Sequence, residues 1–301
     1  MPASPLSGPA GLLGATALLH VALAVACGVA LVLGWGGTLT GVPAALKPFK
    51  FMVSAAVMLA ALAVLLPRMT LGPFGRWLFA GVVAGTLVVE SGCILVQAAR
   101  GTTSHFNTAT AFDAAVWSTM ASAIALLTLA MLGAALVATA RPLHMPGLLA
   151  AAWRAGLWIF LFAAASGYGM AGRGQHTVGA PDGGAGLPLL NWSLTHGDLR
   201  VSHFLALHAL QALPLLAWGL LALPVPNLGR GLVLGAATLL LAAAALLSFA
   251  QALGGRPLLR GAHASRFLDA APPSVGGPGN DGHDGLARAR GAPPGDGVRR
   301  L

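Results

Sequence analysis

Two carboxylates and several histidines are the residues of this sequence whose types could carry chemistry. Glu90 is the only glutamate and stands inside a long apolar run, as does His208, and Asp198 stands just before the run that contains His208. Imidazole nitrogens bind Zn, Cu and Fe, and a carboxylate can complete such a site or act as a general base. We take Glu90, His208 and Asp198 as candidate catalytic residues. The candidate metal ligands are His105, His176, His203 and His208.

Each of these residues also has a purely structural interpretation. Glu90 could simply pair with Lys50, because a buried charge needs a partner in any case. His208 could donate to a backbone carbonyl, and Asp198 is typical of a helix N-cap. The five-residue spacing of His203 and His208 corresponds to roughly 140° around a regular helix, which makes them poor joint ligands for one ion.

The composition excludes a soluble globular protein. Hydrophobic residues make up 56% of the chain and charged residues 8%, with a mean hydropathy of +0.79, whereas soluble domains are about a quarter charged. The formal net charge is +9, but no basic stripe with interleaved aromatic residues exists, so we expect no nucleic-acid partner. Cys27 and Cys93 show neither disulfide nor metal-ligand spacing, and His20, on the face of Cys27, is expected to be packing. The expected environment is the lipid bilayer.

Seven apolar runs are each long enough to cross a bilayer, which takes roughly 20 helical residues. Because backbone polar groups must be satisfied within lipid, these runs are expected to be helices. The sequence therefore predicts an all-α, polytopic membrane helix bundle in residues 1–255, with Asp113 as the N-cap of the fourth helix. Residues 256–301, rich in Gly, Pro and Arg, are expected to form a disordered tail. The predicted spans are about 11–34, 48–67, 75–98, 113–139, 147–169, 200–222 and 230–253.

An odd number of helices puts the two ends of the chain on opposite sides of the membrane. We call the N-terminal side side A and the opposite side side B. The side-B gaps, 35–47, 99–112 and 170–199, hold nearly every distinctive polar motif. Functional residues concentrate on such loops. We expect the longest gap, 170–199, to fold over the side-B mouth as a lid with His176 pointing inward.

The distribution of positive charge sets the expected orientation. A plain count of Lys and Arg slightly favours side B as the cytoplasmic side. However, the side-B cations stand among the polar motifs and could serve a site, while the side-A arginines have no such neighbours. We therefore expect side A to be cytoplasmic and the motif-bearing loops to be extracytoplasmic, in a bacterial inner membrane.

Depth along the predicted helices brings three polar residues to one level. At 1.5 Å per residue, Glu90 and His208 lie about 12 Å below the side-B ends of their helices, and Ser54 lies about 10 Å below. We predict a polar cavity that opens to side B above a dry floor, with Glu90 in direct or water-bridged reach of His208 or Lys50. The expected binding residues are Lys50, Ser54, Gln97, Arg100, Asn107, Arg200 and Gln211.

Several motifs together resemble those of a group of uncharacterised bacterial multi-pass membrane proteins. They are KPFKF at 47–51, RGTTSHFN at 100–107, HTVGAPDGG at 176–184 and GDLRVSHFLALHALQ at 197–211. The resemblance spans residues 11–255 and implies no activity. The chain is also weakly similar to the seven-helix zinc hydrolases of the alkaline ceramidase and adiponectin-receptor type. The paired histidines of those enzymes lie four apart on one helix, whereas His203 and His208 lie five apart.

Three functions remain open from the sequence. The first is a membrane-embedded enzyme that binds zinc, copper or haem and acts on a small-molecule or lipid ligand. The second is a proton-coupled transporter in which Glu90 and His208 relay protons, although the paired central Gly/Pro interruptions and repeats of carriers are missing. The third is a sensory or assembly protein whose side-B loops bind a partner.

Overall fold

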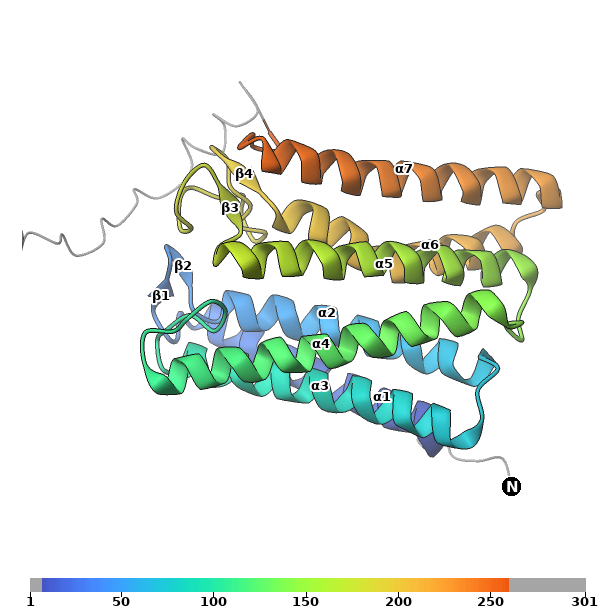
Figure 1. The fold of residues 1–301 in the computed structure, drawn as a ribbon, viewed down its shortest axis with the longest axis horizontal. Helices are drawn as coiled ribbons and strands as arrows, with labels where there is room; N and C mark the ends of the chain where they lie inside the picture. Colours follow the sequence, from blue (N-terminus) through green and yellow to red (C-terminus); the bar gives the residue numbers. More distant parts are fainter. Residues whose placement is uncertain (1–6, 260–301) are drawn as a thin grey trace, which may run out of the picture. The chain divides into compact units, whose positions relative to one another are not determined.

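The computed structural model describes residues 7–259, and within that range the chain forms seven long helices (Figure 1). All seven are long and apolar enough to cross a membrane, which confirms the predicted all-α membrane bundle. The predicted tail lies outside the described residues from position 260 onward. The helices are α1 Gly8–Val32, α2 Leu46–Leu65, α3 Pro73–Ala99, α4 Ala111–Ala140, α5 Gly147–Arg173, α6 Arg200–Ala222 and α7 Asn227–Leu253.

Local sequence chemistry explains where several helices begin and end. Pro73 opens α3 at a position where no backbone donor is needed, and Gly174 ends α5 in the left-handed conformation at φ +66°. At the start of α4, the prediction that Asp113 is the N-cap is wrong. Thr110 is the cap, and its hydroxyl accepts a hydrogen bond from the Asp113 backbone N–H. Asp113 instead lies in the first turn, where a carboxylate suits the positive end of the helix.

Short strands shape two of the side-B loops. β1 (Thr38–Leu39) pairs antiparallel with β2 (Val42–Pro43) in the loop before α2. β3 (Thr177–Val178) pairs antiparallel with β4 (Gly197–Asp198), and this pair ties together the two ends of the segment between α5 and α6. On side A, α2 runs into a single 3-10 turn, η1 (Leu66–Arg68), before α3.

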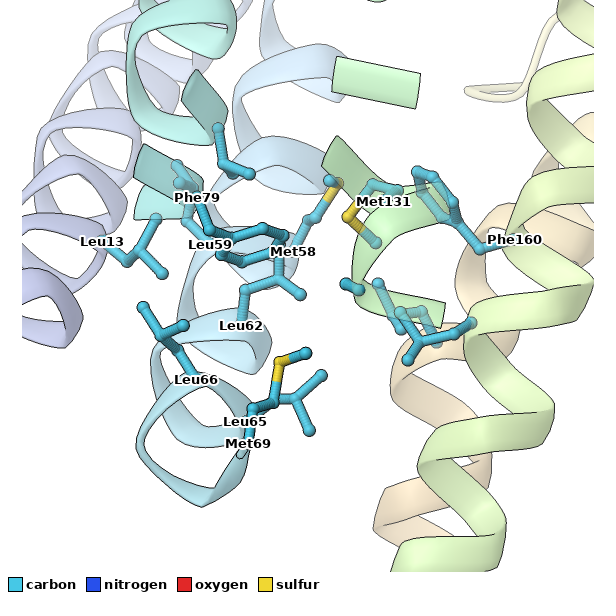
Figure 2. Close-up of a cluster of buried hydrophobic side chains, with 14 of the residues drawn as sticks. Leu13, Met58, Leu59, Leu62, Leu65, Leu66, Met69, Phe79, Met131 and Phe160 are labelled. Carbon is cyan, nitrogen blue, oxygen red and sulfur yellow. The ribbon is translucent and has the colours of Figure 1, made fainter. Parts of the chain in front are cut away.

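The side-A half of the bundle is a dry apolar core. Leu59, Leu62, Met131 and Leu157 have no exposed surface and belong to one cluster that joins α1 to α6. Figure 2 shows this cluster, with side chains of α1, α2, α3, α4 and α5 meeting in the space between the helices. Burial of so many apolar side chains makes this region the rigid floor beneath the side-B half, as predicted.

Small residues bring α5 and α6 into close contact. At Gly156 on α5, an added Cβ would lie 3.0 Å from both the Ala209 carbonyl oxygen and Leu210 Cα on α6. Small residues at helix crossings let membrane helices approach closely. This contact sets the position of α6, which carries His203 and His208 toward the side-B end.

Candidate functional site

Charged and titratable side chains from five parts of the chain gather at the side-B ends of the helices. Their electrostatic interactions connect α2, α3, α6, the loop before α4 and the segment between α5 and α6. We call this group the polar cluster. Its members are Lys47, Lys50, Glu90, His105, His176, Asp182, Arg200 and His203.

Lys47 and His105 form the link between α2 and the loop before α4. The Lys47 ammonium donates to His105 Nδ1 at 3.2 Å. A lysine ammonium has no acceptor, so this bond requires a lone pair on Nδ1 and puts the ring proton of a neutral His105 on Nε2. Burial, followed by the positive charge of Lys47, holds the pKa of His105 well below its usual value. His105 is therefore neutral at pH 7.

His176 lies in the segment between α5 and α6, and its imidazole points toward carboxylates. Its Nδ1 lies 3.2 Å from Asp182 Oδ1 and 3.8 Å from Asp198 Oδ1, and its side chain is 22% exposed. Burial, followed by the charge of Arg200, lowers the pKa of His176 to about 4 despite these carboxylates. The hydrogen-bond contact of Nδ1 is with the Thr177 hydroxyl at 3.3 Å, and Nε2 has no hydrogen-bond partner among residues 7–259.

His203 is held against α5 by its other ring nitrogen. Its Nδ1 lies 2.8 Å from the backbone carbonyl oxygen of Ala163 and 3.3 Å from the Ser166 hydroxyl. Because a carbonyl oxygen only accepts, Nδ1 carries the proton and Nε2 is left with a lone pair. Gly167 makes room for the ring, since a Cβ there would lie 3.4 Å from it.

His208 lies deeper than His203 and in an aromatic environment. Its ring stacks edge-on with Phe204 at 4.5 Å between centroids, and Phe204 meets Trp192 of the segment above at 5.5 Å. Gln211, one turn further down, is buried with amide atoms that lack a well-formed hydrogen bond. His208 therefore lies next to the polar cluster, on the side of the cluster that is nearer to side A.

The four predicted metal ligands gather at one end of the bundle without forming one coordination shell. His105 interacts electrostatically with both His176 and His203, and His203 interacts with His208. Across residues 7–259, however, no group of three or more His, Cys, Asp or Glu side chains is close enough to hold a metal ion. In two imidazoles, His176 and His203, Nε2 has no hydrogen-bond partner among residues 7–259.

Glu90 is the most unusual member of the polar cluster. It has no exposed surface, and neither carboxylate oxygen has a hydrogen-bond partner among residues 7–259. Within residues 7–259, the expected direct hydrogen bond between Glu90 and His208 or Lys50 is therefore not formed. The cation that acts on Glu90 is instead Lys47, through space and without an ion pair. A buried carboxyl group without a partner is costly, so its retention calls for an explanation.

Asp198 is committed to protein contacts. Its carboxylate accepts from Arg200 Nε at 2.9 Å and Nη2 at 2.6 Å, and from the Ser193 backbone N–H at 2.8 Å. Oδ1 also accepts from the Arg200 backbone N–H. Burial alone would raise the pKa of Asp198, but these hydrogen bonds and the charge of Arg200 hold it below its usual value. Asp198 therefore positions α6 and the segment between α5 and α6. Because these contacts hold the carboxylate in its ionised form, this geometry does not offer Asp198 as a proton donor for a reaction.

Three of the predicted binding residues, Gln97, Arg100 and Asn107, form hydrogen bonds to other groups of the protein. Gln97 donates to Asp113 Oδ1 at 2.8 Å, and Arg100 bonds both Gln97 and Asp113. Asn107 donates to the Thr102 hydroxyl and accepts from the Ala109 backbone N–H, which folds the loop before α4. These contacts join α3 to α4 and use most of the polar atoms that a ligand would need.

Lys50 and Ser54 differ from those three residues. Lys50 Nζ donates to the backbone carbonyl of Leu190 at 3.1 Å and so tethers the segment between α5 and α6 to α2. Ser54 is half-buried one turn below Lys50. The tether, together with the mostly buried His176, fits the predicted lid over the side-B end of the bundle.

One polar contact was missed by the sequence reasoning. His20, expected to be packing alone, is fully buried and lies 2.8 Å from the Thr16 carbonyl oxygen and 2.7 Å from the Ser91 hydroxyl. It therefore joins α1 to α3. Lys47 and Asp182 were also absent from the candidates, although both stand in the quoted motifs. A stretch with two lysines in an otherwise apolar helix was the available signal for Lys47.

The charged groups at the side-B end fall into two sets. Asp198 and Arg100 are used in structural ion pairs, whereas Lys47, Glu90 and His105 belong to none of the ion pairs within residues 7–259. Comparison of the chain with protein-family models, with curated proteins and with solved structures finds no match to any of them.

Proposed function

We propose that this integral membrane protein exchanges a proton at Glu90 when a small ligand binds in the polar cluster. The observation that carries the proposal is the state of Glu90, which is fully buried with both oxygens lacking a hydrogen bond. An ionisable group within a membrane helix is by default a functional residue, often part of a proton relay. Proton-coupled transporters use residues of this kind.

The cost of an ionised Glu90 supports this assignment. On insertion scales, a carboxylate at the centre of a membrane helix costs about 2.5–3.5 kcal/mol. Without a hydrogen bond or an ion pair, a bound proton and the nearby charge of Lys47 are the two means of neutralisation that the geometry offers. A ligand that changes the field of Lys47 would then change the proton occupancy of Glu90.

A route for the proton leads from Glu90 toward side B. Lys47 interacts with Glu90 and donates to His105, and Lys47 is exposed to solvent at the end of α2. His105 in turn interacts with His176, whose Nε2 has no hydrogen-bond partner among residues 7–259. With bridging water, such a series of donors and acceptors can carry a proton between the membrane interior and the surface.

Infrared difference spectroscopy of the full chain in lipid nanodiscs tests this proposal. A step in pH should produce a carboxylic-acid C=O signal that is present in the wild type and lost in Glu90→Gln, since Gln keeps the shape and cannot titrate. The difference between the wild type and Glu90→Gln assigns the signal to Glu90, because the aspartates are the same in both proteins. Identical difference spectra for the wild type and Glu90→Gln would refute the proposal.

Thr86→Val is the matched control. Thr86 lies one turn before Glu90 on α3, and its hydroxyl bonds to the carbonyls of Val82 and Val83 in its own helix. The substitution removes a buried polar group at nearly constant volume without touching the polar cluster. We expect the carboxyl signal to be unchanged in this variant, while a loss there as well would indicate a general packing defect.

A second candidate, a cofactor-binding membrane enzyme, rests on the two oriented imidazoles. His203 donates Nδ1–H to the Ala163 carbonyl oxygen, as metal-bound histidines commonly do with the ring nitrogen that does not bind the metal. Nδ1 of His176 contacts the Thr177 hydroxyl and lies 3.2 Å from Asp182 Oδ1. Haem, zinc or copper bound there would supply redox or Lewis-acid chemistry. Metal analysis and an absorption spectrum of the purified protein test this: a Soret band selects haem, and stoichiometric zinc or copper selects a metal site. Clean protein with neither excludes this candidate.

We also propose that side B faces outward from a bacterial inner membrane. The support is that the side-B cations Lys47 and Arg200 belong to the polar cluster, which leaves the arginines of side A to determine orientation. Reporter tags placed before α1 and after α7 should report from opposite compartments, with the first inside. Both tags in one compartment would contradict the odd number of spans, and the reverse assignment would contradict the orientation.

A further inference from the structure

We infer that the ligand of the polar cluster carries a phosphate-type oxyanion, bound by Lys47 and Lys50. The inference specifies the ligand of the function proposed above, and so rests on it for the link to Glu90. The two residues are the only lysines in the sequence, and both stand in the first two turns of α2. Positions three apart share one face of a helix, so their ammonium groups can meet one ligand.

Neither lysine has a carboxylate partner. Lys47 donates to an imidazole nitrogen of His105, and Lys50 donates to the backbone carbonyl of Leu190. Among residues 7–259, no ion pair includes either of them. An ammonium group has three donors, so each lysine keeps further donors for a ligand.

The acidic groups nearby are already in use. Asp198 is bound by Arg200 and the Ser193 backbone N–H. Asp182 accepts from the backbone N–H of Thr177 and lies against His176. Neither aspartate therefore forms an ion pair with a lysine, although Asp182 acts on Lys47 and Asp198 acts on Lys50 through space.

Three cations stand close together at this point of the fold. Lys47, Lys50 and Arg200 are close enough to repel one another electrostatically. A doubly charged oxyanion would relieve this repulsion and accept several of the free donors at once. The positive end of α2 adds to the attraction, since anions are stabilised near helix N-termini.

The site is also accessible. Lys47 is exposed and Lys50 is half-buried, although groups from α3, α6 and two loops surround them. The carbonyl of Leu190 belongs to the segment above the site, so an anion that takes over the Lys50 donor would release this tether. Such a position at the membrane surface is open to two sources of the same chemistry: a free phosphate and the headgroup of an anionic lipid.

The test measures thermal stability of the full chain in nanodiscs at constant ionic strength. One arm adds inorganic phosphate to phosphatidylcholine nanodiscs, with chloride as the replacement anion, and the other arm uses nanodiscs that contain phosphatidylglycerol. A ligand that binds only the folded state raises Tm. Phosphate acting in the first arm identifies a free oxyanion, and stabilisation confined to the second arm identifies a lipid headgroup.

The variants separate a specific site from general charge attraction. Each of Lys47→Gln and Lys50→Gln should weaken binding about tenfold, as expected for loss of a hydrogen bond to a charged group. Lys50→Arg, which keeps the charge, should retain most of the binding. Arg230→Gln on side A is the matched control, because Arg230 donates to the backbone carbonyl of Leu223 much as Lys50 does to that of Leu190.

Several outcomes overturn the inference. No stabilisation in either arm would do so, and so would equal stabilisation of the wild type and a monodisperse Lys47→Gln/Lys50→Gln double variant. Glu90→Gln distinguishes this inference from the function proposed above. If that variant binds the anion as the wild type does, and the wild type shows no Glu90 proton signal, the anion site stands while the proton-linked function fails.

Discussion

The Asp198 carboxylate accepts two hydrogen bonds, of 2.9 and 2.6 Å, from the Arg200 guanidinium at the beginning of α6. The same arginine also donates to the backbone carbonyl of Asn191. One ion pair thus joins the first turn of α6 to the segment between α5 and α6, which covers the polar cluster. The side chain of Asp198 is only 1% exposed, so its replacement would leave a partly buried arginine without a carboxylate partner.

Asp198→Asn is therefore expected to destabilise the protein by about 3 kcal/mol, the cost of breaking a buried pair by removing one member. Denaturation of the protein in detergent micelles measures the change. Asn227→Ala is the control, because Asn227 accepts from Arg230 at the start of α7 in an exposed setting and should change stability by less than about 0.5 kcal/mol. Equal effects of the two substitutions would show that the Asp198 pair is not structural.

Gly197→Ala should be poorly tolerated because β4 lies directly against α7. A Cβ at this position would stand 2.0 Å from the Ala252 carbonyl oxygen. The neighbouring atom is backbone and cannot turn aside, so we expect a loss of roughly 1–3 kcal/mol or more. Gly184→Ala, where a Cβ would meet nothing within 4 Å, should fold like the wild type. A stable Gly197→Ala protein would mean that β4 does not pack on α7 in this way.

The segment between α5 and α6 should lose stability as the pH falls from 6.5 toward 4. The pKa of His176 is about 4 in the folded protein, against 6.5 for a free histidine. In this pH window His176 is protonated in the unfolded chain and neutral in the folded chain, so a falling pH favours unfolding. The groups that face His176 are Asp182, Asp198, Arg200 and Lys47.

His176→Asn should reduce this pH dependence, which hydrogen exchange of residues 177–198 between pH 4 and 7 would measure. His105 contributes in the same direction because its pKa is also lowered, so a residual slope is expected. The Asp198 contribution is lost only below pH 3.8, outside the window. An unchanged slope in the variant would remove His176 as the cause.

The buried contact between His20 and Ser91 should behave as a coupled pair. Ser91→Ala leaves His20 Nε2 without its partner inside the bundle, which should cost about 1–3 kcal/mol. The double variant His20→Phe/Ser91→Ala, in which both polar groups are absent, should recover much of this loss. Thermal unfolding of the single and double variants measures the coupling. Strictly additive losses would mean that the hydrogen bond contributes nothing.

The number, length and order of the helices follow from the sequence alone. Each span is a long apolar run, and an unpaired backbone is too costly in lipid for such a run to be anything but a helix. The predicted span 200–222 coincides with α6, and the other spans agree with the helices to within a few residues. The gathering of polar motifs at one end also follows, because consecutive spans cross in alternate directions, which determines which loops share a side.

The partners of the site residues were decided by the tertiary structure. Sequence spacing brought Glu90, Ser54 and His208 to one depth, but depth does not specify how each helix is rotated about its axis. Packing of the helices sets that rotation. In the folded protein the charge of Lys47 acts on Glu90 through space, while the Glu90 carboxylate has no hydrogen-bond partner among residues 7–259. The pairing of His20 with Ser91 depends on the same rotation, because the two residues are 71 positions apart and nothing in either helix alone indicates the other.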